Sequence, residues 1–366
     1  MSELYDLAVI GAGPAGASAA ITAARAGARV LLLERGSFPR EKVCGEFVSS
    51  ESLELLQSLL AGNEADALLH HAPRIVSART FIDGQIIETE ISPPAFSIPR
   101  YEMDAALWRS AQSSGVDSRQ QVAARRIDRN GNFAVEALAS EERFSACAVI
   151  NATGRWSNFK AASMAVPSGP KWIGVKAHFV EADAAFSQSL DLHFFGGGYC
   201  GVSSLGNGRI NACAMVRADV AKNLAEVFRC EPRLAERSRE WKAVTEEVST
   251  SPLIFHPSAP VADGILLAGD AAGFIDPFVG DGISMALHSG AMAASSLIAS
   301  GFHVEQAAAH YHADYERRLL PAFNHAARIR SLVSLPYFVR WPMLKMMKVA
   351  GISEYFLKRT RAGVAA

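Results

Sequence analysis

The stretch "DLAVIGAGPAGASAA", residues 6–20, decides the fold of this chain. The apolar run before Gly11 is typical of a buried strand, and the small residues after Pro14 favour a helix. Gly11, Gly13 and Gly16 fit the spacing G-x-G-x-x-G. In that motif the glycines allow a tight turn, close approach of the backbone to a pyrophosphate, and close packing of helix on strand. The stretch therefore predicts a dinucleotide site at the N-terminus of a helix.

A second apolar run, "ARVLLLER" at residues 28–35, predicts a second strand that ends at Glu34. A carboxylate about twenty residues after the glycine loop accepts hydrogen bonds from ribose hydroxyls, and it disfavours a 2′-phosphate. NADP is therefore not expected in this site. Gly11 and Gly16 also have the spacing of a P-loop, but Ala17 stands where a P-loop has its lysine, so nucleotide hydrolysis is not expected.

The composition bounds the class of protein. The chain has 366 residues, of which 49% are hydrophobic, enough for a sizeable core. Its net charge of −1 argues against nucleic acid as the main partner. The five cysteines include no C-x-x-C pair, which suits a reduced, cytoplasmic protein. The first strand begins almost at once and leaves no room for a signal peptide.

Residues 283–304 contain no charged side chain and would be long enough to cross a bilayer. The window is rich in alanine, glycine, serine and histidine rather than in large aliphatic residues. We therefore expect a buried helix here rather than a membrane span.

Two later segments favour FAD over NAD. Residues 146–157 predict another strand that ends at a glycine turn, and residues 264–287 predict a strand, an aspartate, a turn and the start of a helix. Asp270 is placed to bind a ribityl hydroxyl. The helix N-terminus near Gly282 and Ile283 is suited to the N1/O2 edge of a flavin, where negative charge develops on reduction.

The set "GAGPAG", "ER", "NATG" and "GDAAGFIDPFVGDGI" resembles the FAD-dependent oxidoreductases with the para-hydroxybenzoate hydroxylase fold, over nearly the whole chain. Within that superfamily, "KVCGEF" at residues 42–47 and the late motif are most similar to the geranylgeranyl-reductase-like flavoproteins. The resemblance implies an FAD-dependent enzyme. It also implies that Arg100 corresponds to a family arginine that reaches the cofactor, and that a strand around Val122 contacts the adenine. The expected cofactor-binding residues are Gly11, Gly13, Pro14, Ala15, Gly16, Glu34, Arg35, Arg100, Val122, Asp270, Pro277, Gly280, Gly282 and Ile283.

The expected fold is α/β, with a Rossmann-type (glutathione-reductase-like) FAD-binding domain, an inserted mixed β-sheet substrate domain and a C-terminal helical segment. β-branched runs around an Asp83-Gly84 turn predict a hairpin in the insert. A pocket between the two domains is the expected substrate site. The boundaries are 1–72, 100–165 and 255–310 for the FAD-binding domain, 73–99 and 166–254 for the sheet, and 311–366 for the helical segment.

The sequence departs from its relatives in several places. Thr153-Gly154 stands where aromatic hydroxylases usually have Asp-Gly, so direct reduction by NADH or NADPH is expected to be slow. "GGGYCGVSS" at residues 196–204 keeps the tyrosine of the prenyl-reductase motif but lacks its tryptophan and proline, which speaks against a long prenyl substrate. "AAGFIDP" is also similar to flavin-dependent halogenases, yet their W-x-W-x-I-P motif and catalytic lysine are not recognisable. Gly273 replaces a histidine that many hydroxylases carry.

Three residues are candidates for catalysis. In the "CGE" turn, Cys44 either donates a proton to the flavin site or modulates the ring, or it is a small buried thiol. Glu46 is either a general acid or a solvated or ion-paired carboxylate. Tyr199 either offers its hydroxyl to the substrate as a polar contact or packs in the sheet. His178 and His193 are expected to be ordinary strand residues. No metal site is expected, because the sequence has no H-E-x-x-H or other metal spacing.

The resulting function is transfer of two electrons through FAD to or from a hydrophobic small molecule, with C=C reduction favoured. A monooxygenase acting on an aromatic or polyketide-like substrate is the main alternative. A halogenase and a non-catalytic electron carrier are two others. The reductant would be NAD(P)H or a redox protein.

The last part of the chain bears on partners. Residues 317–361 hold ten basic residues and one acid, Glu354, among many aromatic and methionine residues. This segment could contact an anionic membrane surface, cover an apolar pocket, or pack as helices on the FAD-binding domain. The expected location is cytoplasmic, with membrane contact, if any, only at the surface.

Overall fold

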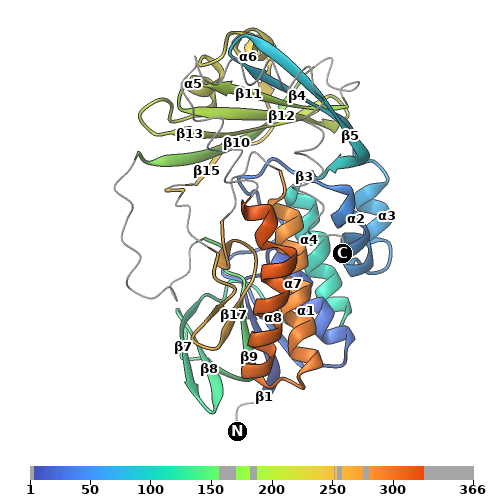
Figure 1. Cartoon of the computed structure of the whole chain (residues 1–366), viewed down its shortest axis with the longest axis vertical. Helices are drawn as coiled ribbons and strands as arrows, with labels where there is room; N and C mark the ends of the chain where they lie inside the picture. The colour runs from blue at the N-terminus through green and yellow to red at the C-terminus, as the bar shows by residue number, and fades with distance from the viewer. Residues whose placement is uncertain are drawn as a thin grey trace.

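The computed structural model describes residues 4–155, 170–181, 188–250, 252–253, 258–274 and 280–324. Two β-sheets lie one above the other, with most of the helices beside the lower sheet (Figure 1). The expectation of a Rossmann-type α/β domain combined with a mixed second sheet is confirmed.

The first sheet is built around β1 (Leu4–Ile10). This strand lies parallel to both β2 (Val30–Leu33) and β9 (Arg143–Asn151). The strands that follow β1 in the sequence are therefore placed on both of its sides. This arrangement creates a crevice at the carboxyl ends of the strands. The remaining strands of this sheet are β6 (Asp117–Arg119), β7 (Ala124–Asn130), β8 (Asn132–Ala137), β16 (Val261–Ala262) and β17 (Ile265–Leu267).

The second sheet has the order β14-β10-β13-β12-β11-β4-β5-β3, with β15 also paired to β10. Its hairpin turns at Asp83-Gly84, where both residues have positive φ (52° and 75°), so the predicted hairpin is confirmed. The strands are β3 (Phe47–Val48), β4 (Arg74–Ile82), β5 (Gln85–Ser97), β10 (Trp172–Val180), β11 (Ser189–Phe195), β12 (Gly198–Gly206), β13 (Arg209–Arg217), β14 (Lys242–Ala243) and β15 (Val248–Thr250).

One strand joins the sheet from a part of the chain where we expected only the FAD-binding domain. β3 immediately follows the "CGE" turn, and its Phe47 pairs with Ser97 at the edge of the second sheet. The turn is therefore held between the two sheets, because the segment before it follows β2 of the first sheet.

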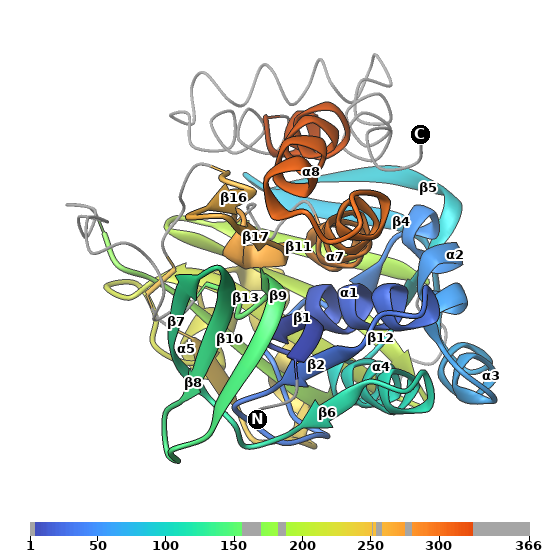
Figure 2. The same cartoon turned by 90° about the horizontal axis from the view of Figure 1, so that it is seen from below.

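Helices α1, α7 and α8 are stacked in that order beside the first sheet (Figure 2). The helices and short 3₁₀ turns are α1 (Pro14–Arg25), α2 (Ser50–Leu59), α3 (Glu64–Leu69), α4 (Arg100–Ser113), α5 (Leu224–Phe228), α6 (Pro232–Arg237), η2 (Ser238–Glu240), η3 (Gly269–Ala271), α7 (Gly282–Ala299) and α8 (Val304–Arg318). Most of the basic C-terminal segment lies outside the described residues.

Of the described helices, α7 alone is long and apolar enough to cross a membrane by length and composition. It packs instead between α1 and α8, as expected for a buried helix. Ser18 Oγ donates to the carbonyl of Leu287 at 2.7 Å. A Cβ added at Gly290 would lie 2.0 Å from the carbonyl oxygen of Ala15, so the two helices touch backbone to backbone.

This contact predicts the effect of enlarging Gly290. Gly290→Val forces α7 away from α1 and should lower the free energy of unfolding by about 1–3 kcal/mol, the usual cost of overpacking. Urea unfolding of the holoprotein measures the change. Gly196→Ala is the matched control, because nothing lies within 4 Å of a Cβ built there. Equal stability of the Gly290→Val variant and the wild type would contradict the close contact.

Candidate functional site

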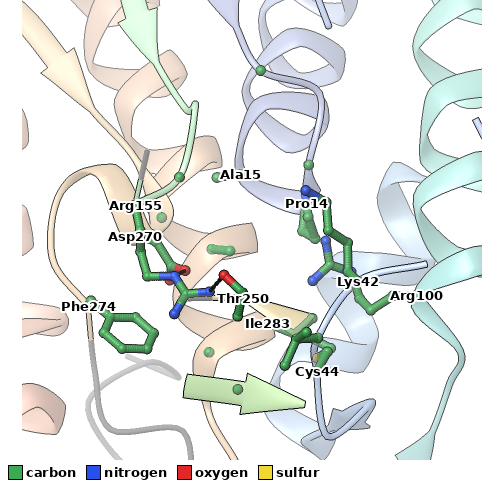
Figure 3. Close-up of a pocket in the computed structure, with 18 of the residues that line it drawn as sticks. Pro14, Ala15, Lys42, Cys44, Arg100, Arg155, Thr250, Asp270, Phe274 and Ile283 are labelled. Carbon is green, nitrogen blue, oxygen red and sulfur yellow. Dashed lines mark hydrogen bonds and ion pairs between the residues drawn. The ribbon is translucent and has the colours of Figure 1, made fainter. Parts of the chain in front are cut away.

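A cavity of about 730 Å³ opens between the two sheets, at the carboxyl ends of the first sheet's strands (Figure 3). Pockets for small molecules and cofactors usually measure roughly 300–1,000 Å³. Twelve of the fourteen expected cofactor-binding residues line it: Gly11, Gly13, Pro14, Ala15, Glu34, Arg35, Arg100, Val122, Asp270, Gly280, Gly282 and Ile283. Gly16 lies behind the loop, and Pro277 lies outside the described residues.

The glycine loop has the geometry that its motif requires. Gly11 has φ 97°, a conformation that favours glycine, and its N–H donates to the carbonyl of Leu33 at 2.7 Å. A Cβ at Gly16 would lie only 1.7 Å from the Gly11 carbonyl oxygen, whereas a Cβ at Gly13 would meet nothing closer than Arg100 Nη2 at 4.0 Å. The space in front of Gly13 is therefore open to a ligand, at the N-terminus of α1.

Glu34 is buried at the end of β2, and four donors hold its carboxylate. The backbone N–H groups of Ala12 and Gly36 each donate at 2.9 Å, and Arg40 donates through two nitrogens at 2.6 and 2.9 Å. Burial opposes ionisation, but these hydrogen bonds outweigh it and lower the pKa of Glu34. Beside it, the backbone N–H of Val122 donates to the Glu34 carbonyl at 2.9 Å, which sets Val122 at the cavity wall. Val122 lies between β6 and β7, and not in a strand as the resemblance had implied.

Arg100 begins α4, and only 14% of its side-chain surface is exposed. Its Nε and Nη2 both donate to Asp104 at 2.7 Å, and its backbone N–H donates to Glu46 at 3.0 Å. The guanidinium lies beside the glycine loop, as the family resemblance implies, but its charge is balanced within α4.

The late motif forms the opposite wall. Asp270 lies 3.6 Å from Arg155, whose guanidinium stacks 4.5 Å from the ring centroid of Phe274 (Figure 3). Gly282 and Ile283 start α7 at the cavity, and a Cβ at Gly282 would meet nothing within 4 Å. The amide-rich end of α7 therefore faces the cavity across from the end of α1.

These residues fit FAD. Two helix N-termini, each with a glycine whose missing side chain leaves open space, border a single cavity at the crevice above β1. One end suits a diphosphate and the other suits the electron-rich edge of an isoalloxazine. The carboxylate of Asp270 lines the cavity and would accept a hydroxyl hydrogen bond. The Glu34 carboxylate also borders the cavity, but the four hydrogen bonds from the chain already fill its acceptor positions.

Glu46 is fully buried in a cluster of charged side chains. We did not predict this cluster from the sequence, because His178 was expected to be an ordinary strand residue. Lys176 Nζ donates to Glu46 Oε1, and His178 Nε2 donates to Oε2, each at 2.8 Å. Lys176 also donates to Glu41. Burial opposes ionisation of Glu46, but the hydrogen bond from His178 and the charge of Lys176 lower its pKa. His178 is thus a partner of the "CGE" turn, and not an ordinary strand residue as we expected.

Glu41, Glu46 and His178 offer three potential metal ligands within 4.8 Å of one another. The ammonium group of Lys176, hydrogen-bonded to both carboxylates, already supplies the positive charge in that cluster. His193 lies elsewhere on the sheet, where its Nδ1 pairs with Glu231 at 2.8 Å and its ring stacks on Phe81.

Cys44 and Tyr199 also line the cavity. Burial is the main cause that raises the pKa of the Cys44 thiol, so the group is protonated at neutral pH. The Glu46 N–H donates to its sulfur at 3.3 Å. Tyr199 is 7% exposed and packs with an apolar cluster of Met215, Leu253 and Phe274.

Sequence reasoning missed several lining residues. Arg155 directly follows the "NATG" turn and Lys42 lies two residues before Cys44 of the "CGE" turn, so their positions carried a signal that we did not use. The inward face of the second sheet was found only in the structure, because alternation along a strand does not say which of its two faces meets the cavity. These further residues are Lys42, Arg155, Leu190, Leu192, Gly201, Cys213, Met215, Thr250, Leu253 and Phe274.

Fold and site together define a dinucleotide-binding oxidoreductase. The model of the pyridine nucleotide-disulphide oxidoreductase family matches residues 5–207, more than half of the chain, and the chain belongs to this family. It is an FAD-dependent oxidoreductase, and the resemblance to the geranylgeranyl-reductase-like flavoproteins is confirmed.

Two curated relatives align over most of the chain. A menaquinone reductase from Mycolicibacterium smegmatis is 26% identical and covers 93% of this chain and 87% of its own. Digeranylgeranylglycerophospholipid reductase 2 from Methanopyrus kandleri is 28% identical, with 79% and 76% covered.

Solved structures share the fold. A geranylgeranyl bacteriochlorophyll reductase-like protein from Thermoplasma acidophilum superposes with a TM-score of 0.78 at 21% identity, over 99% of this chain and 95% of its own. A flavin-dependent brominase gives 0.79 at 19% identity, over 99% and 94%.

The glycine loop yields a paired prediction. Gly13→Val places a side chain in the open space, and Gly13 has extended backbone (φ −68°, ψ −177°) that valine adopts readily. We expect FAD to bind about 5- to 150-fold more weakly, from an overpacking cost of about 1–3 kcal/mol. Fluorescence titration of the apoprotein measures the affinity. Gly16→Val should instead lower the stability of the apoprotein itself. The same loss of stability in both variants would contradict the assignment.

The buried cluster yields a second prediction. Lys176→Met leaves Glu46 without its cation and should cost about 3–5 kcal/mol of stability at pH 7. Lys176→Met combined with Glu46→Gln should recover part of this loss, because the fully buried carboxylate is no longer charged; the partly exposed Glu41 loses its partner in both variants. The lowered pKa of Glu46 means that its contribution is present above the ordinary value of 4.5 and is lost as pH falls through the folded-state pKa.

Urea unfolding at pH 7 and at pH 3.5 provides the measurement, with the exposed Lys171→Met as the control. Wild type should lose more stability than the double variant on going to pH 3.5. Additive effects of the two single substitutions would show that Lys176 and Glu46 are not coupled.

Proposed function

We infer that this protein reduces a C=C bond of a hydrophobic, isoprenoid-type substrate, using electrons carried by FAD. Two relatives that align with most of the chain are named as reductases, one of menaquinone and one of a digeranylgeranyl lipid. Both names refer to molecules with isoprenoid chains. The observation in the structure that carries the proposal is the apolar half of the cavity.

That half is formed by the second sheet and the late motif. Neighbouring strands contribute Leu192 opposite Gly201 and Tyr199 opposite Met215, and Phe274 and Leu253 close the cluster. Burying apolar substrate surface against such side chains contributes about 25 cal/mol per Å². An apolar substrate is therefore bound without needing a charged group at this end.

The missing tryptophan of the "GGGYCGVSS" stretch is offset in part by aromatic residues from other strands. Trp172 on β10 and Phe194 on β11 pack against the apolar cluster, and the Phe194 and Tyr199 ring centroids are 5.5 Å apart. Trp172 and Phe194 are not among the residues that line the cavity, so they would support the side chains that contact the substrate.

Reduction of a C=C bond requires one hydride and one proton, and FAD bound here would supply the hydride after an external reductant has given it two electrons. The chain must supply the proton. Cys44 is protonated at neutral pH because its pKa is raised, while Glu46 is ionised because its pKa is lowered. Cys44 is therefore the better proton donor of the two, and Glu46 would position the turn that carries it.

The physiological reductant is proposed to be a redox protein rather than free NAD(P)H. Thr153 donates through both its N–H and its hydroxyl to Asn151 Oδ1, at 3.1 and 2.7 Å. It thus presents no carboxylate where the hydroxylases carry one. We further propose a cytoplasmic protein that meets its apolar substrate at a membrane surface.

The proposal is tested by anaerobic stopped-flow spectroscopy. Dithionite-reduced enzyme should be reoxidised by a prenylated quinone or a geranylgeranyl lipid, with formation of the saturated product. Cys44→Ala should slow this step by about 10²–10⁴-fold, the usual contribution of a general acid. Reduction of the flavin by dithionite should be unchanged, which serves as the internal control.

Other outcomes separate the alternatives. Oxygen consumption coupled to hydroxylation of an added aromatic compound would instead identify a monooxygenase. If no alkene reoxidises the flavin in the absence of oxygen, the reductase proposal is wrong.

A further inference from the structure

We propose that Lys42 is the cation that binds the diphosphate of FAD, and that FAD binding is therefore coupled to proton uptake by this chain. Lys42 lines the cavity next to the glycine loop, and its side chain extends toward Pro14 at the start of α1 (Figure 3). It lies opposite the half of the cavity that holds the substrate cluster, so this role is separate from the proposed reduction.

The neighbouring cations are already balanced by carboxylates. Arg40 is bound through two nitrogens to Glu34, and Arg100 is bound through two nitrogens to Asp104. Such bidentate pairs hold the guanidinium group in a fixed orientation. Neither arginine adds a net charge to the diphosphate end of the cavity.

Lys42 has no such partner. Among the residues that the structure describes, no acidic side chain forms an ion pair with it, and the nearby Glu41 is bound to Lys176. Arg35 also lines the cavity, but it is exposed to solvent and lies at the end of β2. Lys42 is half-buried, so its charge is poorly hydrated before a ligand arrives.

The ionisation of Lys42 agrees with this placement. Burial, together with the positive charges of Arg40, Arg100 and Arg35, lowers its pKa to about 8, and Glu34 only partly opposes the shift. A diphosphate beside the ammonium group reverses the balance, because the added negative charge favours the protonated form. Binding of FAD therefore raises the pKa of Lys42, and near pH 8 the complex takes up a proton.

The linkage has a defined sign and size. Below pH 7 the lysine is charged in both states and the affinity is constant. If the complex stays protonated, the dissociation constant of FAD rises about eightfold between pH 7.5 and pH 9. At pH 8 about half a proton is taken up for each FAD bound.

Isothermal titration calorimetry of the apoprotein with FAD tests this on the wild-type chain. Titrations at pH 8 in HEPES and in Tris, whose ionisation enthalpies differ, give the number of protons taken up. A value near one half supports the proposal, and a value of zero overturns it.

Three variants assign the effect to Lys42. Lys42→Met should bind FAD about 10- to 100-fold more weakly at pH 7.5, the loss expected for a charge-assisted hydrogen bond, and should show no proton uptake. Lys42→Arg should keep most of the affinity and also lose the proton uptake, because arginine does not titrate in this range. The exposed Lys222→Met serves as the control and should behave as wild type.

Wild-type affinity in Lys42→Met, or persistence of the eightfold pH dependence in that variant, would overturn the proposal. The measurement needs no substrate, so its failure would leave the proposed reduction untouched. Failure of the alkene assay would likewise leave the Lys42 assignment standing.

Discussion

The site depends on one close contact, the crossing of α1 and α7 at Ala15. The methyl group of Ala15 lies 3.0 Å from where a Cβ of Gly269 would stand, and its carbonyl lies 2.0 Å from where a Cβ of Gly290 would stand. The glycine loop and the late segment that holds Gly269 and Gly290, far apart in the sequence, therefore meet at one alanine. Because no side chain separates them, the two helix N-termini are held at a fixed spacing. That spacing must match the length of FAD between its diphosphate and its flavin ring.

A second constraint docks the sheets on each other. Glu46 belongs to the turn that follows the first sheet's β2, yet it is held by Lys176 and His178 from the second sheet. The Asn211 side chain also donates to the Cys44 carbonyl at 3.0 Å. A buried carboxylate with a full set of donors tolerates little movement, because each lost hydrogen bond would leave a charge unpaired. Cys44 is thus placed at the cavity by groups from both sheets.

The sequence indicated the cofactor side of this molecule far better than the substrate side. The spacing of Gly11, Gly13 and Glu34 follows from the tight turn after β1 and from the length of the strand–helix–strand unit. The glycine loop and the end of β2 could therefore be predicted. Lys176 and His178 could not be, since a lysine and a histidine in a strand look like solvated residues until a distant carboxylate is packed against them. The cavity face of β11, β12 and β13 was hidden for a related reason. Alternation gives two faces, and only the position of the FAD-binding domain decides which one is enclosed.

The order of the strands has a consequence for how the chain reaches its native state. In the second sheet β4 lies parallel to β11, with Ser77 paired to Ser189, and in the first sheet β1 pairs with β9. Neither pair of strands can form until the long segment between its two strands has been made. The segment from β1 to β9 overlaps in sequence with the segment from β4 to β11. Such non-local pairing slows folding because loop-closure entropy is lost before the contacts that offset it form. During synthesis on the ribosome, the flavin pocket is therefore assembled only after residue 286 has emerged, since Gly282, Ile283 and Ala286 at the start of α7 line it.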